Sequence, residues 1–254
     1  MKPAPFAYHR PENLAEALDL LAEHGDECKP LAGGQSLLPL LAMRLAQPSV
    51  LVDLARVAEL RNRERTVVAA MVTNAQLERD PAGLPPVVTA ALPHIGHFQI
   101  RNRGTVGGSL AHLDPAAEWP ALALLLDARL TLESRDRGRR TLAMSEFMKG
   151  PLQTALEPDE LLTEVAIPEW PDDVRWGFAE VARRPGDFAL AGAACTVIGG
   201  RRRVVVFATG RLPQLVEEPG SIEATGDLHA SARYRKHVAA ALFTRVLAEA
   251  GEAA

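Results

Sequence analysis

The spacing of apolar residues predicts that the chain opens with a small α/β unit. Between residues 14 and 21 leucine and alanine recur at helical intervals, behind Asn13 as a helix cap and ahead of Gly25 as a terminator. Apolar runs at 29–31 and 50–54 have the length of buried strands, and a leucine-rich pattern at 37–45, closed by Pro48, indicates a second helix. We therefore expect one unit over residues 1–57.

Two further sections follow, at 58–170 and 171–254. The elements predicted for the second section are a strand at 66–72, a short helix capped by Thr73 or Asn74, helices at 85–91 and 115–126, hairpin strands at 129–133 and 140–142, and a strand at 161–167. Those predicted for the third section are strands at 177–182, 191–198 and 204–208 and a helix at 230–250 that Ser231 can cap. The proline-containing acidic segment 168–173 is the predicted linker.

Composition narrows the range of functions. A net charge of −4 and an aromatic content of 5% disfavour nucleic acid as a partner, because neither a basic surface nor a set of stacking rings is available. The two cysteines, Cys28 and Cys195, are too few to ligate an iron–sulfur cluster, and they favour a reducing compartment over a disulfide scaffold. No apolar run is long enough to span a membrane, and the first residues lack the apolar core of a signal peptide. We expect a cytoplasmic protein.

Two glycine motifs carry the candidate chemistry. The first glycine motif is Ala32-Gly33-Gly34-Gln35-Ser36, between a predicted strand and a predicted helix, and the second is Thr105-Val106-Gly107-Gly108-Ser109. Glycine lets a ligand approach the main chain, backbone N–H groups and hydroxyls donate to phosphate oxygens, and a helix N-terminus favours an anion. Together the motifs suggest a divided site that grips a dinucleotide pyrophosphate from two sides. A plain turn before a capped helix, with Asp114 as the cap of the helix at 115–126, stays open for the second motif alone.

Other site classes have weaker support. The chain contains neither G-x-x-x-x-G-K-[ST] nor a G-x-G-x-x-G that follows a strand, which disfavours an ATPase and an ordinary Rossmann domain. Each motif begins like the nucleophile elbow of a serine hydrolase but lacks its second glycine, and a His112 near Ser109 in sequence does not make a triad. His94 and His97 have chelating spacing, but two histidines are too few for a closed metal site, so a turn or a packed pair is favoured.

Three arginine-rich turns are also weighed. The arginines at 134–138 and at 201–203 are interpreted as solvated hairpin residues rather than a binding patch. The turn at 183–188 combines two arginines with Asp187 and Phe188, and both a solvated turn and a part of a site stay open there.

These residues closely resemble the FAD-binding medium subunit of the molybdenum hydroxylases, above all the aerobic carbon monoxide dehydrogenase type, which also includes nicotine and related heterocycle dehydrogenases. The resemblance extends over nearly the whole chain. The stretches that carry it are the first glycine motif, residues 101–109, the run Ala111-His112-Leu113-Asp114-Pro115-Ala116-Ala117-Glu118, and residues 6–11, 161–163, 167–168, 186–188, 229–232 and 234–235.

The resemblance implies an α+β fold in which two subdomains form an FAD-binding cradle of the vanillyl-alcohol-oxidase, or PCMH-like, type, followed by a small α+β C-terminal domain. It implies FAD as the cofactor, an iron–sulfur small subunit and a molybdopterin large subunit as partners, and electron transfer from the clusters through FAD to an external acceptor. No catalytic residue and no metal ligand is expected in this chain.

The resemblance also implies which residues bind FAD. The two motifs would hold the pyrophosphate, Asp114 and Glu118 would lie on the adenosine or ribityl side, and the remaining residues would lie near the ring system. The implied set is Ala32, Gly33, Gly34, Gln35, Ser36, Leu37, Thr105, Gly107, Gly108, Ser109, Asp114, Glu118, Leu161, Leu162, Asp187 and Phe188.

The sequence departs from the family pattern at three places. Phe188 stands where tyrosine is common, Leu113 stands where a small alanine is usual and would crowd the loop, and the segment after Arg211 is short, so the C-terminal domain is expected to be trimmed. Two alternatives stay open: a stand-alone FAD oxidoreductase of the same fold, and a flavin-free scaffold subunit that kept it.

Overall fold

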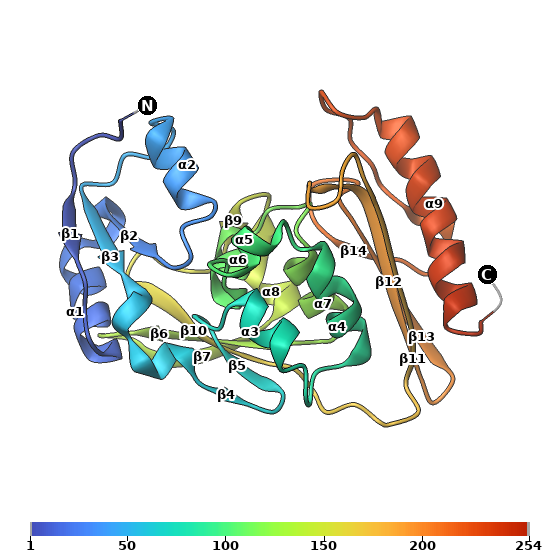
Figure 1. The fold of residues 1–254 in the computed structure, drawn as a ribbon, viewed down its shortest axis with the longest axis horizontal. Helices are drawn as coiled ribbons and strands as arrows, with labels where there is room; N and C mark the ends of the chain where they lie inside the picture. The colour runs from blue at the N-terminus through green and yellow to red at the C-terminus, as the bar shows by residue number, and fades with distance from the viewer. Residues whose placement is uncertain (1, 253–254) are drawn as a thin grey trace.

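The computed structural model describes residues 2–252, which form three units in a row, each with its own sheet (Figure 1). The N-terminal unit lies at one end of the molecule, the unit with the largest sheet lies in the middle, and the C-terminal sheet and its long helix lie at the other end. Buried residues form three clusters in the same order. Leu161 of the central sheet packs in the N-terminal cluster and Phe207 of the C-terminal sheet in the central cluster, so neither junction is an open linker.

The N-terminal unit is a parallel three-stranded sheet with helices on it. Its strand order is β1 (Ala7–His9), β3 (Val50–Asp53), β2 (Cys28–Leu31). The predicted first helix is α1 (Leu14–His24): the Asn13 Oδ1 accepts a hydrogen bond from the N–H of Glu16 at 2.9 Å, and Gly25 ends the helix with a positive φ. The remaining elements are η1 (Gly25–Glu27), α2 (Leu37–Ala42), η2 (Leu54–Arg56) and η3 (Ala58–Arg61).

The central unit is an antiparallel five-stranded sheet covered by short helices. Its strand order is β4 (Arg63–Glu64), β5 (Val67–Ala69), β10 (Glu160–Ala166), β6 (Arg129–Ser134) and β7 (Gly138–Ala143), and β8 (Met148–Gly150) and β9 (Gln153–Thr154) form a separate ribbon. The helices are α3 (Asn74–Arg79), α4 (Pro86–Ala91), η4 (Leu92–His94), α5 (Phe98–Arg101), α6 (Val106–His112), α7 (Glu118–Leu125) and α8 (Met144–Phe147). Every residue of α7 is buried, so this helix is the centre of the unit.

The C-terminal unit is an antiparallel sheet between two helical layers. The strands β11 (Arg175–Ala182), β12 (Ala189–Ile198), β13 (Arg201–Phe207) and β14 (Gln214–Leu215) pair in chain order. The closing helix α9 (Ala232–Glu249) begins at Ser231, whose hydroxyl accepts a hydrogen bond from the N–H of Tyr234, and it packs on β11 and β12. α7 packs against β12 and β13, and η5 (Pro219–Ser221) lies before α9.

Three predicted elements are shorter in the structure. The helix expected at 37–45 ends at Ala42, because Arg44 takes a left-handed φ of 58°, and this leaves Leu45 72% exposed. The strand expected at 66–72 ends at Ala69, because the carbonyl groups at 70 and 72 turn toward α6 instead of a neighbouring strand. The helix expected at 115–126 begins at Glu118; Asp114 does not cap it but closes a turn by accepting the N–H of Ala116 at 2.8 Å.

Candidate functional site

The first glycine motif forms a tight bend between β2 and α2. Gly34 has a φ of 74°, and the side-chain amide of Gln35 donates to the carbonyl of Gly33 at 2.9 Å. Among the described residues, the N–H groups at positions 33–37 have no hydrogen-bond acceptor, and the Ser36 hydroxyl makes no capping bond. A run of half-buried donors without acceptors is what an anionic ligand requires. The first motif therefore supplies the backbone donors that its sequence predicts.

The second glycine motif is not a loop but the first turn of α6. Thr105 is the helix cap, and its hydroxyl accepts the N–H of Gly108 at 3.1 Å. The N–H groups of Val106 and Gly107 donate to the carbonyls of Val72 and Ala70 at 3.0 and 2.9 Å. The N–H groups at 106–109 are thus already used inside the protein, and among the described residues only the N–H of Thr105 in this motif has no acceptor. Its Ser109 hydroxyl has no partner among the described residues either and is a second free donor of the segment.

The two motifs pack directly against each other. A Cβ on Gly33 would overlap the carbonyl oxygen of Arg103, and a Cβ on Gly108 would lie 3.3 Å from the Cβ of Ala32. A Cβ on Gly107 would overlap the backbone of Ala70. These glycines are therefore required for close contact between chain segments rather than for space left to a ligand. The structure brings together the motifs that the sequence separates by about seventy residues.

The residues expected near the flavin ring lie in two different environments, one buried on β10 and one exposed in the 183–188 turn. Leu161 and Leu162 are 5% and 3% exposed and point to opposite faces of β10, one into the N-terminal cluster and one into the central cluster. Phe188 is 59% exposed at the end of the 183–188 turn. A Cβ on Gly186 of that turn would overlap the ring of His97, so this turn lies against the segment that leads to the second motif. Phe188 is therefore open to solvent, whereas the two leucines pack in separate hydrophobic clusters.

Glu118 lies in a buried cluster of ionisable groups at the junction with the C-terminal sheet. Burial, and next the carboxyl of Glu180, raise the pKa of Glu118 to about 8. His94 Nδ1 lies 3.2 Å from the Glu180 carboxylate, and this hydrogen bond raises the pKa of His94. The second carboxylate oxygen of Glu180 is buried without a partner. The charge of Asp114, in the turn before α7, also raises the pKa of Glu118.

Leu113 does not crowd the cradle. It is fully buried in the central cluster and ends α6 with a left-handed φ of 52°. The larger side chain is therefore accommodated in the core, where a leucine contributes apolar packing.

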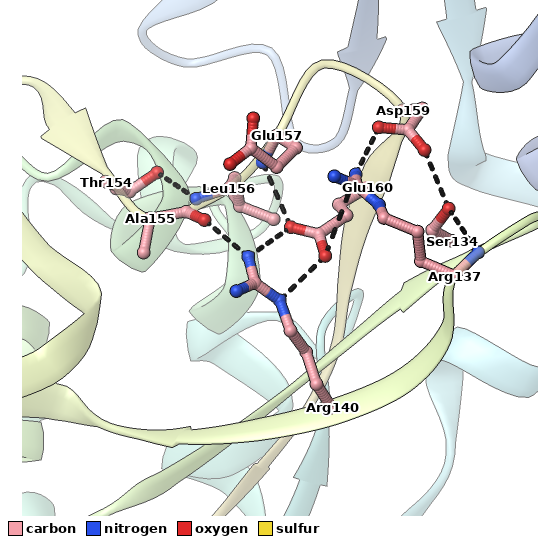
Figure 2. Close-up of polar contacts among 9 residues, drawn as sticks. All are labelled: Ser134, Arg137, Arg140, Thr154, Ala155, Leu156, Glu157, Asp159 and Glu160. Atoms are coloured by element: carbon pink, nitrogen blue, oxygen red, sulfur yellow. Dashed lines mark hydrogen bonds and ion pairs between the residues drawn. The ribbon is translucent and has the colours of Figure 1, made fainter.

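Arg137 of the 134–138 turn and Arg140 of β7 form a network around Glu160 (Figure 2). The Glu160 side chain is 2% exposed and accepts hydrogen bonds from Arg140 at 2.6 and 2.7 Å and from the N–H of Glu157 at 3.0 Å. Arg137 pairs with Asp159, whose pKa is lowered, mainly by the Ser134 hydroxyl. The Arg137 side chain stays 47% exposed, as expected for a turn residue, whereas Arg140 is held by the buried carboxylate of Glu160 from β10. The network fixes the segment just before Leu161.

The sequence pattern predicts Asn74 only as a possible helix cap, but in the structure it contacts both Trp119 and the segment before the second motif. It is 2% exposed, its N–H donates to the carbonyl of Gly104 at 3.0 Å, and its side-chain oxygen accepts the indole N–H of Trp119 at 2.7 Å. Thr73, which is the actual cap, forms an isolated bridge with Thr105. In the sequence Asn74 is only a polar residue next to apolar ones, and nothing local indicates that Gly104 and Trp119 are its hydrogen-bond partners.

The structure does not unite the other candidate groups. His94 and His97 contact different parts of the C-terminal unit, Glu180 and Gly186. Within residues 2–252 no three or more His, Cys, Asp and Glu side chains are placed to hold a metal ion, and no hydrogen bond joins Ser109 to His112. No helix in this range is long and apolar enough to cross a membrane.

Comparison with known proteins gives consistent matches. The family described as FAD binding domain in molybdopterin dehydrogenase matches residues 4–170. The chain is 41% identical over 225 residues to the caffeine dehydrogenase subunit beta of Pseudomonas sp. (strain CBB1), covering 86% of this chain and 76% of that one. It is 40% identical over 284 residues to the nicotine 6-hydroxylase medium subunit of Paenarthrobacter nicotinovorans, covering 99% of each. Carbon monoxide dehydrogenase from Hydrogenophaga pseudoflava matches with a TM-score of 0.92 and 32% identity, covering 99% of both chains.

Proposed function

The chain belongs to the family of FAD-binding domains of molybdopterin dehydrogenases, and we propose that its two packed glycine motifs form the pyrophosphate side of the FAD site. The chain is an FAD-carrying medium subunit of a molybdenum-containing hydroxylase or dehydrogenase. It works with an iron–sulfur small subunit and a molybdopterin large subunit. Bound FAD supplies the redox chemistry, taking electrons from the clusters and passing them to an external acceptor.

The observation that carries the site assignment is the run of unbonded N–H groups at 33–37, held against the second motif. These donors and the Ser36 and Ser109 hydroxyls are suited to bind and orient the two phosphates. The buried leucines at 161 and 162 form walls that exclude water, and the exposed ring of Phe188 is suited to lie against the isoalloxazine. Asp114 and Glu118 complete the proposed set, with Glu118 holding a proton at neutral pH.

The proposed domain division is 1–57, 58–170 and 171–254, supported by the three sheets and by the absence of helix or strand between Ala166 and Arg175. Shortening relative to the nicotine 6-hydroxylase medium subunit is supported by an alignment over 284 positions with a chain of 254 residues, and we assign it to the brief segment after Arg211. A cytoplasmic location is supported by two free, buried cysteines: burial raises the pKa of Cys28 to about 11 and of Cys195 to about 12.

Purification tests the proposal. The chain is expected to copurify with a cysteine-rich subunit and a large molybdenum subunit, and to release one FAD on denaturation. Replacing both free hydroxyls, Ser36→Ala with Ser109→Ala, is expected to weaken FAD binding roughly 10-fold or more, because each lost bond to a phosphate costs about 1 kcal/mol or more. Ser145→Ala, an exposed serine on α8, is the matched control. Equal FAD affinity in the double variant and the control would remove these hydroxyls from the site.

A further inference from the structure

Asn74 lies where the two glycine motifs meet. Its backbone is fixed at the first position of α3, behind Thr73, whose hydroxyl and Gln76 form a capping box. The N–H of Asn74 holds the carbonyl of Gly104, the residue just before the second motif. A Cβ on Gly104 would lie 3.3 Å from the Asn74 side-chain nitrogen and 3.9 Å from Cγ of Gln35 in the first motif. The amide group is therefore beside both motifs.

The orientation of the Asn74 amide follows from Trp119. An indole N–H is only a donor, so the atom it contacts at 2.7 Å is the amide oxygen. Trp119 is 1% exposed, which leaves this bond sealed in the core of the central unit. The amide nitrogen accordingly faces away from Trp119, toward Gly104.

That nitrogen has no acceptor among the described residues. The residue as a whole is 2% exposed, yet the nitrogen is not among the fully buried atoms without a partner, so it borders open space. Buried polar groups in native proteins are almost always hydrogen-bonded, and each exception calls for a missing partner. A ligand acceptor bound at this opening, beside the packed motifs, would be that partner.

We propose that Asn74 is a further cofactor-binding residue, whose side-chain amide donates a hydrogen bond to a pyrophosphate oxygen bound beside the packed glycine motifs. The proposal rests on the FAD site argued above. In this arrangement one amide has two roles. Its oxygen accepts the hydrogen bond from Trp119, and its nitrogen donates to the phosphate. The nitrogen replaces donors that the second motif cannot offer, because the N–H groups of Val106, Gly107 and Gly108 are already bonded.

Asn74→Asp separates these roles. The aspartate keeps the shape and the oxygen that accepts from Trp119, but it replaces the donor with an acceptor that repels phosphate. In full-length protein stripped of flavin and titrated with FAD, we expect the dissociation constant to rise at least ~30-fold. Asn102→Asp adds the same charge at an exposed position nearby and is expected to change it less than ~3-fold. ADP, which has the pyrophosphate but no flavin, should show the same ranking.

A second pair of variants covers the case in which Asn74→Asp does not fold. Trp119→Phe removes the buried hydrogen bond and keeps the Asn74 amide. Asn74→Leu combined with Trp119→Phe removes both hydrogen-bonding groups, which costs little stability because no buried polar group loses its partner. The double variant is expected to bind FAD at least ~10-fold more weakly than Trp119→Phe alone.

The outcomes are distinct. If Asn74→Asp and the double variant bind FAD as tightly as their controls, Asn74 has only a structural role and the proposal fails. If FAD binding weakens but ADP binding does not, the contact with the pyrophosphate is wrong. A wild-type chain that binds no FAD would instead overturn the function proposed above.

Discussion

Glu118→Gln is expected to stabilise the protein, and to do so increasingly as the pH rises. Glu118 is 4% exposed, and burial together with the carboxyl of Glu180 raises its pKa from 4.5 to about 8. At neutral pH the folded chain therefore keeps a proton that the unfolded chain releases. An acid whose folded pKa is raised loses stability as the pH rises from the unfolded to the folded value.

The magnitude follows from the width of that window. Each pH unit above 4.5 costs about 1.4 kcal/mol of the free energy of unfolding until the pH reaches about 8. The accumulated cost is about 1 kcal/mol at pH 5 and about 3 kcal/mol at pH 7. Glutamine has nearly the same shape and no proton to lose, so it removes this cost. For a chain of this length, 3 kcal/mol corresponds to a rise in melting temperature of roughly 6–12 °C.

The assay is urea unfolding of flavin-free protein at pH 5, 7 and 8, since removing FAD separates stability from any effect on binding. Glu223→Gln is the matched control, because this exposed carboxyl makes no contact with the other described side chains. The gain from Glu118→Gln over wild type should grow from pH 5 to pH 8, while the control stays level. A gain that does not change with pH, or a loss of stability at pH 8, would refute the assignment of a buried, protonated Glu118.

Two further predictions concern the network and the motif contact. Arg140→Met leaves the Glu160 carboxylate buried without its main partner and is expected to cost roughly 2–4 kcal/mol in urea unfolding, whereas Arg139→Met, which breaks an exposed pair, should cost under about 1 kcal/mol. Similar losses for both would show that the pair with buried Glu160 adds no more stability than the exposed pair. Gly33→Ala is expected to push the two motifs apart, lowering stability by about 1–3 kcal/mol and weakening FAD binding at least ~10-fold, measured by melting and by titration. Gly220→Ala, which has room for a Cβ, is its control, and unchanged FAD affinity in Gly33→Ala would contradict the tight contact.

Most of the fold follows from local pattern. The first and last helices have both periodicity and a side-chain cap, Asn13 and Ser231, and both caps are confirmed by the structure. The ends of other elements depend on contacts that no local pattern contains. The strand expected at 66–72 is cut short because Ala70 and Val72 accept hydrogen bonds from α6, which begins more than thirty residues later.

The sequence predicts the two motifs of the candidate site, but it does not predict that they pack against each other. A pair of glycines predicts a bend and a close approach, and does not tell whether a ligand or another chain segment makes that approach. The hairpin arginines have the same ambiguity: nothing near Arg140 in the sequence indicates that Glu160 is buried beside it. Asn74 was recognised only as a helix start, since its role depends on Trp119, 45 residues away.

The packing of the motifs also changes the role assigned to each residue. Neighbouring chain segments occupy the space next to Gly33 and Gly107, so the site depends on how closely these segments pack. A larger residue at either position would displace the N–H donors without contacting the ligand. Because the N–H groups at 106–108 are already bonded, the second motif acts mainly as a rigid support that keeps the free N–H groups at 33–37 in place. Loss of FAD after a glycine substitution therefore reports on that support, whereas loss after Asn74→Asp reports on the ligand contact itself.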